Sequence, residues 1–226
     1  MKNEIDFLIK SEKIYENKKY LYYRSKKNIE ETRSILVSMA THNGGERYFN
    51  LKGLLEKSSF DLLFVKDPKN SYYLGDDGGN SYNKLFSSIL SSYSSDNITF
   101  FGSSMSGYGA LFHASFFNAN AIVSNPQLNF EATLQHCWVD LRKTISKIKS
   151  PINLDTFEKF INSSGTIHAE FGKHPMDKAN FNILNSLKIS NLKIVLHDDP
   201  THGYYFHDIE KACLIHKKIT SQNNLD

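Results

Sequence analysis

The chain of 226 residues has little of what marks several classes of protein. It contains two cysteines, Cys137 and Cys213, which lie far apart and form no C-x-x-C pair, so neither a disulfide framework nor a paired-cysteine zinc site is indicated. No apolar run approaches the roughly 18 residues of a membrane span. The first residues, MKNEIDFLIKSEK, have charges on both sides of a short apolar patch and no signal-peptide core. We therefore expect reduced core cysteines and a cytoplasmic protein without a transmembrane segment.

The chain also lacks an excess of charge of either sign. Its 27 basic and 24 acidic residues give a formal net charge of +3, which is too mild for a clustered nucleic-acid-binding face, so no nucleic-acid partner is expected. The densest basic run, residues 142–149, alternates with isoleucine and serine and is typical of the exposed side of an amphipathic helix. With 40% hydrophobic and 13% aromatic residues the composition is globular, and the length predicts a single domain over residues 1–226.

Motifs for nucleotide and metal binding are missing or incomplete. Gly102 and Gly107 have the spacing of a P-loop, but Tyr108 and Gly109 stand where its lysine and hydroxyl residue belong. The G-x-G-x-x-G fingerprint and the H-E-x-x-H zinc motif are absent as well. Zinc-ligand residue types do occur late in the chain, at an unspecific spacing: His168, Glu170, Asp198, Asp199 and His202. We predict neither a bound cofactor nor a metal site.

Apolar strands alternate with helical patterns along the chain, which predicts an α/β fold with a mainly parallel sheet and helices on both faces. The helical pattern of residues 127–163 is longer than a crossover helix requires, so we expect it to form a small helical cap over the functional site. The tyrosine-containing loop 70–80 has the turn residues of an exposed connection whose tyrosines line a pocket. Strands are predicted at 19–24 (at a sheet edge), 34–39, 60–66, 98–101, 121–124, 165–171 and 192–197, and helices at 51–57, 81–93, 108–117, 179–187 and 207–219.

The stretch ITFFGSSMSGYGA, residues 98–110, sets a serine in a tight turn between an apolar strand and an apolar helix. This is the form of a nucleophile elbow, G-x-S-x-G, whose strained turn presents a serine hydroxyl. Ser104 is the serine, and Ser106 stands where the strict motif has its last glycine. Small flanking residues allow strand and helix to approach closely. We therefore hypothesise that Ser104 is a nucleophile; the competing interpretation is a turn that only joins strand to helix.

A serine hydroxyl is a weak nucleophile unless a histidine accepts its proton and a carboxylate orients that histidine. In α/β-hydrolase proteins the chain order is serine, acid, histidine. His202 follows the last predicted strand and precedes the last predicted helix, where that fold presents its base, and Gly203 leaves room beside the ring. His207 is the second choice. His197 and His216 are more typical of packing or surface histidines.

The acid is expected on the loop after the preceding strand, at residues 172–177. Asp177 is the only carboxylate there, which makes it the first candidate. The rivals are Glu170 at the strand's end, Asp198 and Asp199, whose closeness to His202 also fits a tight turn, and Asp155.

An oxyanion hole is expected to use two backbone N–H groups. The first is that of Met105, which follows the nucleophile at the start of the helix. The second is expected in the glycine-rich loop ATHNGG, residues 40–45, after the strand 34–39, at Ala40 or Thr41.

Four runs along the chain, GSSMSGYGALF, AIVSNPQLNFEATL, IHAEFGKHPMD and THGYYFHD, together resemble a known family. They are similar to small bacterial α/β-hydrolase-fold proteins encoded with surface-polysaccharide genes, among them capsular polysaccharide O-acetyltransferases with a Ser-Asp-His triad. The resemblance implies a three-layer hydrolase-like sandwich with Ser104 as nucleophile and His202 as base. Its acid lies in the loop after Phe171, where His174 replaces the aspartate usual before proline and Asp177 takes that part.

The resemblance also implies a reaction, the transfer of acetyl from acetyl-CoA to a carbohydrate hydroxyl such as one on capsular polysaccharide. The residues themselves fit ester hydrolysis equally well, because the same triad serves both reactions. A hypothesis from a different class is a non-catalytic hydrolase-fold protein, either carbohydrate-binding or an accessory subunit of a polysaccharide or secretion system.

Overall fold

The computed structural model describes residues 1–28, 33–44 and 47–222. Its strands are β1 Lys13–Tyr15, β2 Lys18–Tyr23, β3 Ile35–Met39, β4 Asp61–Val65, β5 Ile98–Ser103, β6 Asn120–Ser124, β7 Ile167–Phe171 and β8 Leu192–Leu196. Its α-helices are α1 Lys2–Lys10, α2 Leu51–Lys57, α3 Asn80–Leu90, α4 Met105–Phe117, α5 Phe130–His136, α6 Val139–Ile145, α7 Glu158–Ile161, α8 Pro175–Ser186 and α9 Ile209–Gln222, with short 3₁₀ helices at Ser95–Asn97 and Leu154–Thr156.

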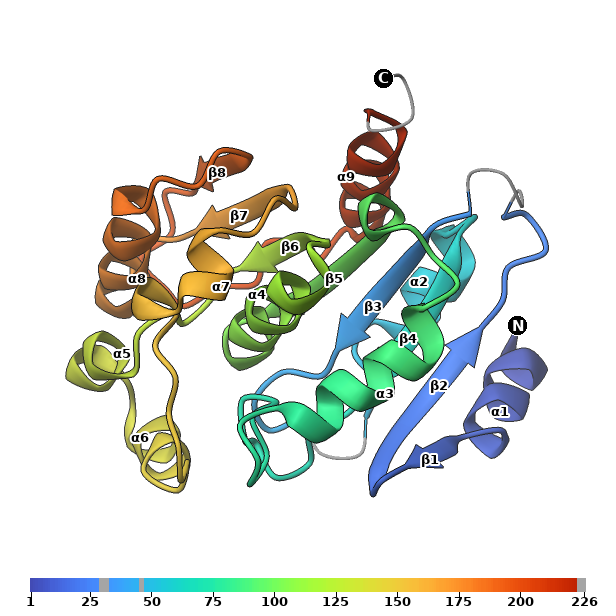
Figure 1. Cartoon of the computed structure of the whole chain (residues 1–226), viewed down its shortest axis with the longest axis horizontal. Coiled ribbons are helices and arrows are strands. Elements are labelled where there is room, and N and C mark those ends of the chain that lie inside the picture. The colour runs from blue at the N-terminus through green and yellow to red at the C-terminus, as the bar shows by residue number, and fades with distance from the viewer. Residues whose placement is uncertain (29–32, 45–46, 223–226) are drawn as a thin grey trace.

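The strands form one eight-stranded sheet in the order β1-β2-β4-β3-β5-β6-β7-β8 (Figure 1). From β4 to β8 every neighbouring pair is parallel, whereas β1 and β2 pair antiparallel at one side. Parallel neighbours need crossover connections, and the helices between the strands supply them. The predicted α/β class with a mainly parallel sheet is confirmed.

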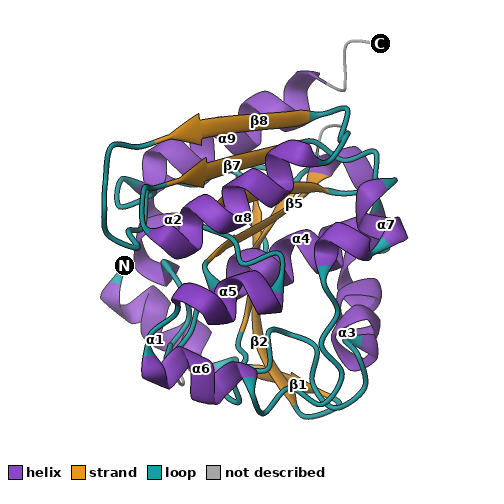
Figure 2. Ribbon diagram, turned by 90° about the vertical axis from the view of Figure 1, so that its left-hand side faces the viewer, coloured by secondary structure: helices purple, strands orange, loops and turns teal. Residues whose placement is uncertain are grey.

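The sheet is covered by helices on both faces, which makes three layers (Figures 1 and 2). All five residues of β3 are buried, and they alternate between two cores. Ile35 and Val37 pack in the larger core with residues of α3, α4 and α8. Leu36 packs on the other face with residues of α1, α2 and α9. A strand buried on both faces is what a continuous apolar run such as ILVSM predicts.

The carboxyl ends of the parallel strands meet at one edge of the sheet, and the loops there hold the candidate residues. The segment 127–163, expected as a cap, contains α5, α6, a 3₁₀ turn and α7. Figure 1 shows α5 and α6 beyond this edge, on the side to which the arrows of β3, β6 and β7 point. No described helix has both the length and the apolar character that a membrane crossing requires.

Two local predictions were wrong. The strand expected at a sheet edge, β2, lies between β1 and β4, because the short hairpin strand β1 pairs outside it. The loop 70–80 is not simply exposed, since Tyr72 and Tyr73 are completely buried in the larger core. Gly45, the last residue of the predicted oxyanion loop, lies outside the described residues.

Candidate active site

Ser104 occupies the turn between β5 and α4 in a strained backbone conformation, with φ 55° and ψ −116°. A positive φ is unfavourable for a residue with a side chain, and such strain is concentrated at functional turns. The turn is held by the Ser104 N–H, which donates to the carbonyl of Ser124 at 2.9 Å. Gly102 permits the close approach, since a Cβ there would collide with the carbonyl oxygen of Ser106. The local geometry is that of a nucleophile elbow.

Ser106, which departs from the strict elbow motif, has a structural use for its hydroxyl. The side chain is completely buried. Its Oγ accepts from the N–H of Ser103 at 2.9 Å and donates to the carbonyl of Ser103 at 3.0 Å. A glycine would leave this hydroxyl bridge unmade. The serine therefore fits the motif sterically and ties the first turn of α4 to the end of β5.

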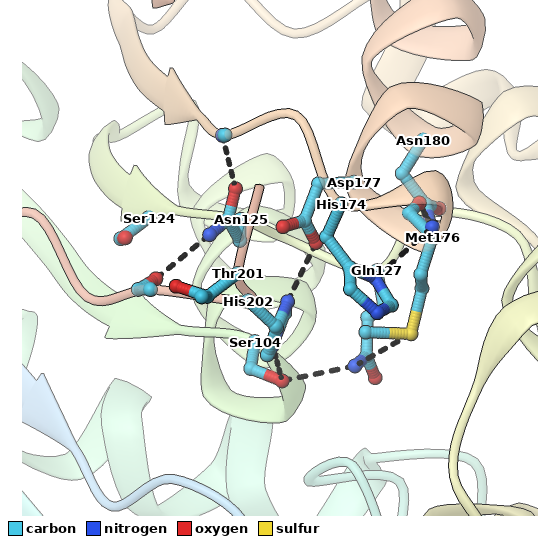
Figure 3. A network of polar contacts seen from close by, with 12 residues as sticks. Ser104, Ser124, Asn125, Gln127, His174, Met176, Asp177, Asn180, Thr201 and His202 are labelled. Carbon is cyan, nitrogen blue, oxygen red and sulfur yellow. Dashed lines mark hydrogen bonds and ion pairs between the residues drawn. The ribbon is translucent and has the colours of Figure 1, made fainter. Parts of the chain in front are cut away.

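Ser104, His202 and Asp177 form a continuous series of hydrogen bonds (Figure 3). The Nε2 of His202 lies 2.9 Å from the Oγ of Ser104, and its Nδ1 lies 2.6 Å from Oδ1 of Asp177. Asp177 is 2% exposed and Ser104 is 7% exposed, so little water competes for these bonds. A serine, an imidazole and a carboxylate in this order can move the hydroxyl proton to the ring while the carboxylate orients the ring.

Asp177 lies in the first turn of α8 and not in a loop. His174 caps that helix, because its Nδ1 accepts from the N–H of Met176 at 3.3 Å. Among the described residues nothing donates to the second carboxylate oxygen of Asp177, Oδ2, although it is buried.

The loop that carries His202 is fixed by Asn125, a residue that sequence reasoning noted only as part of the run Asn-Pro-Gln. The Nδ2 of Asn125 donates to the carbonyl of Gly203 at 2.7 Å, and its Oδ1 accepts from the N–H of Gly172 at 2.9 Å. Gly203 was expected to leave room beside the ring of His202. In the structure it leaves room for the carboxylate of Asp199, with which a Cβ on residue 203 would collide. The φ of Asn125 is positive, a conformation that asparagine adopts more readily than most residues, so an asparagine directly after a buried strand is the sequence signal that could have marked residue 125.

A second residue missed by sequence reasoning contacts the nucleophile directly. The Nε2 of Gln127 donates to the Oγ of Ser104 at 2.9 Å (Figure 3). The hydroxyl of Tyr72 donates to the Oε1 of Gln127. Gln127 is 1% exposed and Tyr72 is completely buried. A polar side chain soon after a strand's carboxyl end is a weak signal, because turns there are polar in any case.

Of the expected oxyanion donors, the structure leaves two unoccupied. The N–H groups of Met105 and Thr41 have no hydrogen-bond partner among the described residues. The Oγ1 of Thr41 donates to the carbonyl of Ser103 at 2.7 Å, and this bond holds the loop that carries Thr41 beside the elbow. The prediction of a donor at Ala40 was wrong, because its N–H donates to the carbonyl of Val65 at 3.0 Å as part of the sheet.

The rival acid Glu170 is a buried carboxylate with partners of its own. His168 Nε2 lies 2.9 Å from Oε1, while His197 Nε2 at 2.7 Å and Lys211 Nζ at 2.6 Å contact Oε2. Burial acts to raise the pKa of Glu170, but the bonds from His168, Lys211 and His197 outweigh it and lower the pKa to about 2. Glu170 is thus a charged centre of a separate cluster, which we call the Glu170 cluster (Glu170, His168, His197 and Lys211).

The remaining candidate acids and histidines also have local surroundings that account for them. Asp199 accepts from the N–H and hydroxyl of Thr201, the tight turn that was its simpler interpretation. His216 is buried between Thr99 and Ser34, and burial lowers its pKa to about 3. Asp198 pairs with Lys173, Asp155 accepts from Asn129, and His207 is exposed before α9. No three His, Cys, Asp or Glu side chains in the described ranges are arranged to hold a metal ion.

The segment 127–163 contributes an aromatic side chain beside the site. The ring of Trp138 lies 5.5 Å from the ring of His202 and 6.4 Å from that of His42, and it is 41% exposed. His42 follows Thr41, and its Nε2 bonds the hydroxyl of Thr144 on α6 at 2.9 Å. Burial lowers the pKa of His42, which favours its neutral ring. The segment therefore contacts both the base and the loop with the Thr41 N–H.

With this geometry in view, the chain was compared with known proteins. No protein-family model matches it, and no curated protein is similar enough to count as a relative. Among solved structures it is similar to the capsule O-acetyltransferase of Neisseria meningitidis serogroup A, at 19% identity and a TM-score of 0.67 over 93% of each chain. A mutant of that enzyme has been solved in complex with CoA.

Two further structures share the fold. Carboxyl esterase 2 of Tuber melanosporum aligns at 14% identity and a TM-score of 0.62, over 90% of this chain and 82% of the esterase. The glycosylation-associated protein Gap123 complex of Streptococcus agalactiae aligns at 16% identity and a TM-score of 0.64, over 95% of this chain but 46% of the other. At these identities the likeness establishes the α/β-hydrolase-like fold, which is the expected one.

Proposed function

We propose that the protein is a serine acyl-transfer enzyme that works through an acyl-enzyme. The observation that carries this proposal is the series of hydrogen bonds from the Oγ of Ser104 through His202 to Asp177. A strained elbow turn and two unoccupied backbone N–H groups beside it support the same conclusion.

In the first half-reaction His202 Nε2 accepts the hydroxyl proton of Ser104 while Oγ bonds to the acyl carbonyl carbon. The carbonyl electron pair moves to its oxygen, which the N–H groups of Met105 and Thr41 stabilise by about 3 kcal/mol each if they act as oxyanion donors elsewhere do. Collapse of this intermediate breaks the bond to the leaving group, which takes the proton from His202. In the second half-reaction His202 accepts a proton from the acceptor hydroxyl while that oxygen bonds to the acyl carbon. Collapse then breaks the bond between the acyl carbon and Oγ, and His202 returns the proton to Ser104.

For the acyl donor we propose acetyl-CoA, whose phosphates match a groove beside the site. The groove, of about 650 Å³, is lined by Lys18, Lys69 and Lys147, none of which forms an ion pair within the described ranges, although Lys69 and Lys18 act on Asp76 from a greater distance. Two of its lining residues, Asn70 and Thr144, bond Asn43 and His42, so the groove adjoins the loop that carries the Thr41 N–H. The carboxylates lining the groove are engaged elsewhere: Asp76 with Lys149, Glu16 with Lys84, Asp77 with the Ser81 N–H, and Asp67 with the Tyr73 N–H.

The donor proposal predicts that reversing two groove charges weakens CoA binding. In the double variant Lys69→Glu with Lys147→Glu, the Kd for CoA by calorimetry should rise roughly 10-fold, since each exposed charge contributes up to about 1 kcal/mol. Lys188→Glu, an exposed lysine outside the groove, is the matched control and should leave the Kd unchanged. An unchanged Kd in the double variant would contradict the proposal that this groove binds the phosphates of CoA. Absence of CoA binding to the wild type would contradict the proposal that acetyl-CoA is the donor.

For the acceptor we propose a carbohydrate hydroxyl, as on a capsular polysaccharide. The half-exposed indole of Trp138, next to His202, offers the flat apolar face on which a sugar ring stacks. The segment 127–163 that carries it would also limit access of water to the acyl-enzyme, which favours transfer over hydrolysis.

A fluorophosphonate probe tests the nucleophile without knowledge of the natural substrate. The wild type should be labelled covalently, and Ser104→Ala should lose all labelling because the attacking hydroxyl is gone. Ser92→Ala, an exposed serine, is the matched control and should be labelled like the wild type. Folded wild-type protein that resists labelling would sink the enzyme proposal and favour the accessory, non-catalytic role.

A further inference from the structure

Ser104 receives a hydrogen bond that the serine, histidine and carboxylate series does not require. Besides His202, its Oγ contacts the Nε2 of Gln127 at 2.9 Å. The carboxamide is buried, and it approaches the serine from the segment after β6, whereas His202 approaches from the loop after β8. The two partners thus come from separate segments and meet at one oxygen (Figure 3).

The orientation of this carboxamide is set by Tyr72. The phenol O–H donates to Oε1 of Gln127, so the carbonyl side of the amide is occupied and its NH₂ group faces Oγ. In the described part of the chain, the other contact of this Nε2 is the thioether sulfur of Met176, a weak acceptor, at 3.8 Å. Burial raises the pKa of Tyr72 well above its ordinary value of 10, so the phenol stays protonated and keeps donating.

The backbone that presents Tyr72 is itself strained and held in place. Tyr72 and Tyr73 have φ values of 58° and 60°, a conformation that bulky side chains rarely adopt. The N–H of Tyr73 donates to the buried carboxylate of Asp67 at 3.0 Å, and its hydroxyl donates to the carbonyl of Ala40 at 2.9 Å. Two successive residues persist in such a conformation only when their surroundings fix it, and strain of this kind is found at functional sites.

We propose that Gln127 is a catalytic residue that stabilises negative charge on the Oγ of Ser104, with Tyr72 as its positioning residue; this rests on the proposed acyl-transfer function. Oγ gains charge twice in the cycle. It does so when it loses its proton to His202 and attacks, and again when the second tetrahedral intermediate expels it before His202 returns the proton. The Met105 and Thr41 N–H groups serve the carbonyl oxygen, whereas the Gln127 N–H serves the serine oxygen itself.

The test is the rate constant of labelling by a fluorophosphonate, together with the burst and steady-state rates of p-nitrophenyl acetate hydrolysis. Gln127→Met keeps the length of the side chain but removes the donor, and labelling should slow by roughly 10- to 100-fold. Burst and steady-state rates should both fall, because Oγ is nucleophile in one step and leaving group in the other. Gln127→Glu, assayed at a pH high enough to ionise the new buried carboxyl, presents only acceptors to Oγ and should be slower still.

Tyr72→Phe leaves the donor but frees the carboxamide to rotate, so its labelling rate should fall between those of the wild type and Gln127→Met. Gln135→Ala, an exposed glutamine on α5, is the matched control and should label at the wild-type rate. A structural role alone would reduce the amount of protein that can be labelled and leave the rate constant of the remainder unchanged.

The outcomes separate the two proposals. Wild-type labelling with an unchanged rate constant in Gln127→Met overturns the role of Gln127 and leaves the acyl-transfer function standing. A Gln127→Glu rate equal to or above that of Gln127→Met also overturns it, since hydrogen-bond donation would then not be what matters. A wild type that is not labelled overturns the proposed function, and this inference with it.

Discussion

Two buried carboxylates near the carboxyl edge of the sheet differ in how many bonds they accept. Glu170 has both oxygens bonded, by two histidines and Lys211. Asp177 has one oxygen bonded, by His202, and its other oxygen has no partner in the described part of the chain. A carboxylate that is bonded on all sides is a structural centre. One that leaves its histidine able to bond a serine is arranged for proton transfer.

The histidines that contact these two carboxylates differ in their second contacts. Each carboxylate contacts histidine nitrogens at 2.6 to 2.9 Å, so the pairs are alike at close range. The histidines differ in their other contacts: the second nitrogen of His202 lies 2.9 Å from a serine oxygen, whereas the ring of His197 stacks on Tyr205 at 3.9 Å. A carboxylate–histidine pair alone therefore does not indicate catalysis.

The largest expected effect is on the rate of ester hydrolysis, which should depend on Asp177 far more than on Glu170. Asp177→Asn should lower the rate of p-nitrophenyl acetate hydrolysis by roughly 10³- to 10⁴-fold, because an amide cannot hold the imidazole in its active tautomer or stabilise its charged form. Glu170→Gln should stay within a few-fold of the wild type, since the Glu170 cluster makes no described bond to Ser104 or His202. The opposite result, with Glu170→Gln inactive and Asp177→Asn active, would exchange the two assignments.

A smaller effect is expected on the free energy of unfolding, to which the two carboxylates should contribute differently. The pKa of Glu170 falls from 4.5 to about 2 on folding, which corresponds to about 3 kcal/mol at neutral pH. Because the pKa is lowered, this stability is fully present above about pH 4.5 and is lost as the pH falls toward 2. Urea unfolding should therefore show Glu170→Gln about 3 kcal/mol less stable than the wild type at pH 7, with the gap narrowing by pH 3.

Asp177→Asn is the matched variant in that experiment and should lose less stability at pH 7, because its carboxylate accepts fewer bonds. A gap between wild type and Glu170→Gln that stays constant from pH 7 to pH 3 would show that packing, not charge, accounts for the loss.

Much of the architecture was predictable because it depends on local pattern. The alternation of apolar strands and helices predicted the parallel sheet, and the elbow followed from small residues around Ser104. The strand β1 and helix α1 were not predicted, because β1 has only three residues and α1 packs little of its surface: Leu8 is the one residue of α1 that is buried. The order of strands in the sheet has no local signature at all.

The site was predictable only where chain order limits the choice. His202 and Asp177 were selected by their positions after strands, and the structure brings both to Ser104, although their catalytic roles stay a prediction. Gln127 was not singled out, since its contact spans 23 residues and its partner Tyr72 lies 55 residues away. The prediction of an oxyanion donor at Ala40 was wrong because the N–H of this residue, directly after β3, pairs with β4. How far that pairing continues has no signature in the local sequence.

The side chain of Asn125 joins Gly172, before α8, to Gly203, beside His202. One amide thus sets the spacing between the segment that leads to Asp177 and the segment that carries the imidazole. An inserted residue in either segment would have to be absorbed on the far side of that amide, away from the serine. The turn at 198–201 is held as well, since the N–H of Lys173 donates to the carbonyl of Asp199 at 2.6 Å. Variation in loop length is therefore best tolerated at 188–191, between α8 and β8 and outside the two tethered stretches.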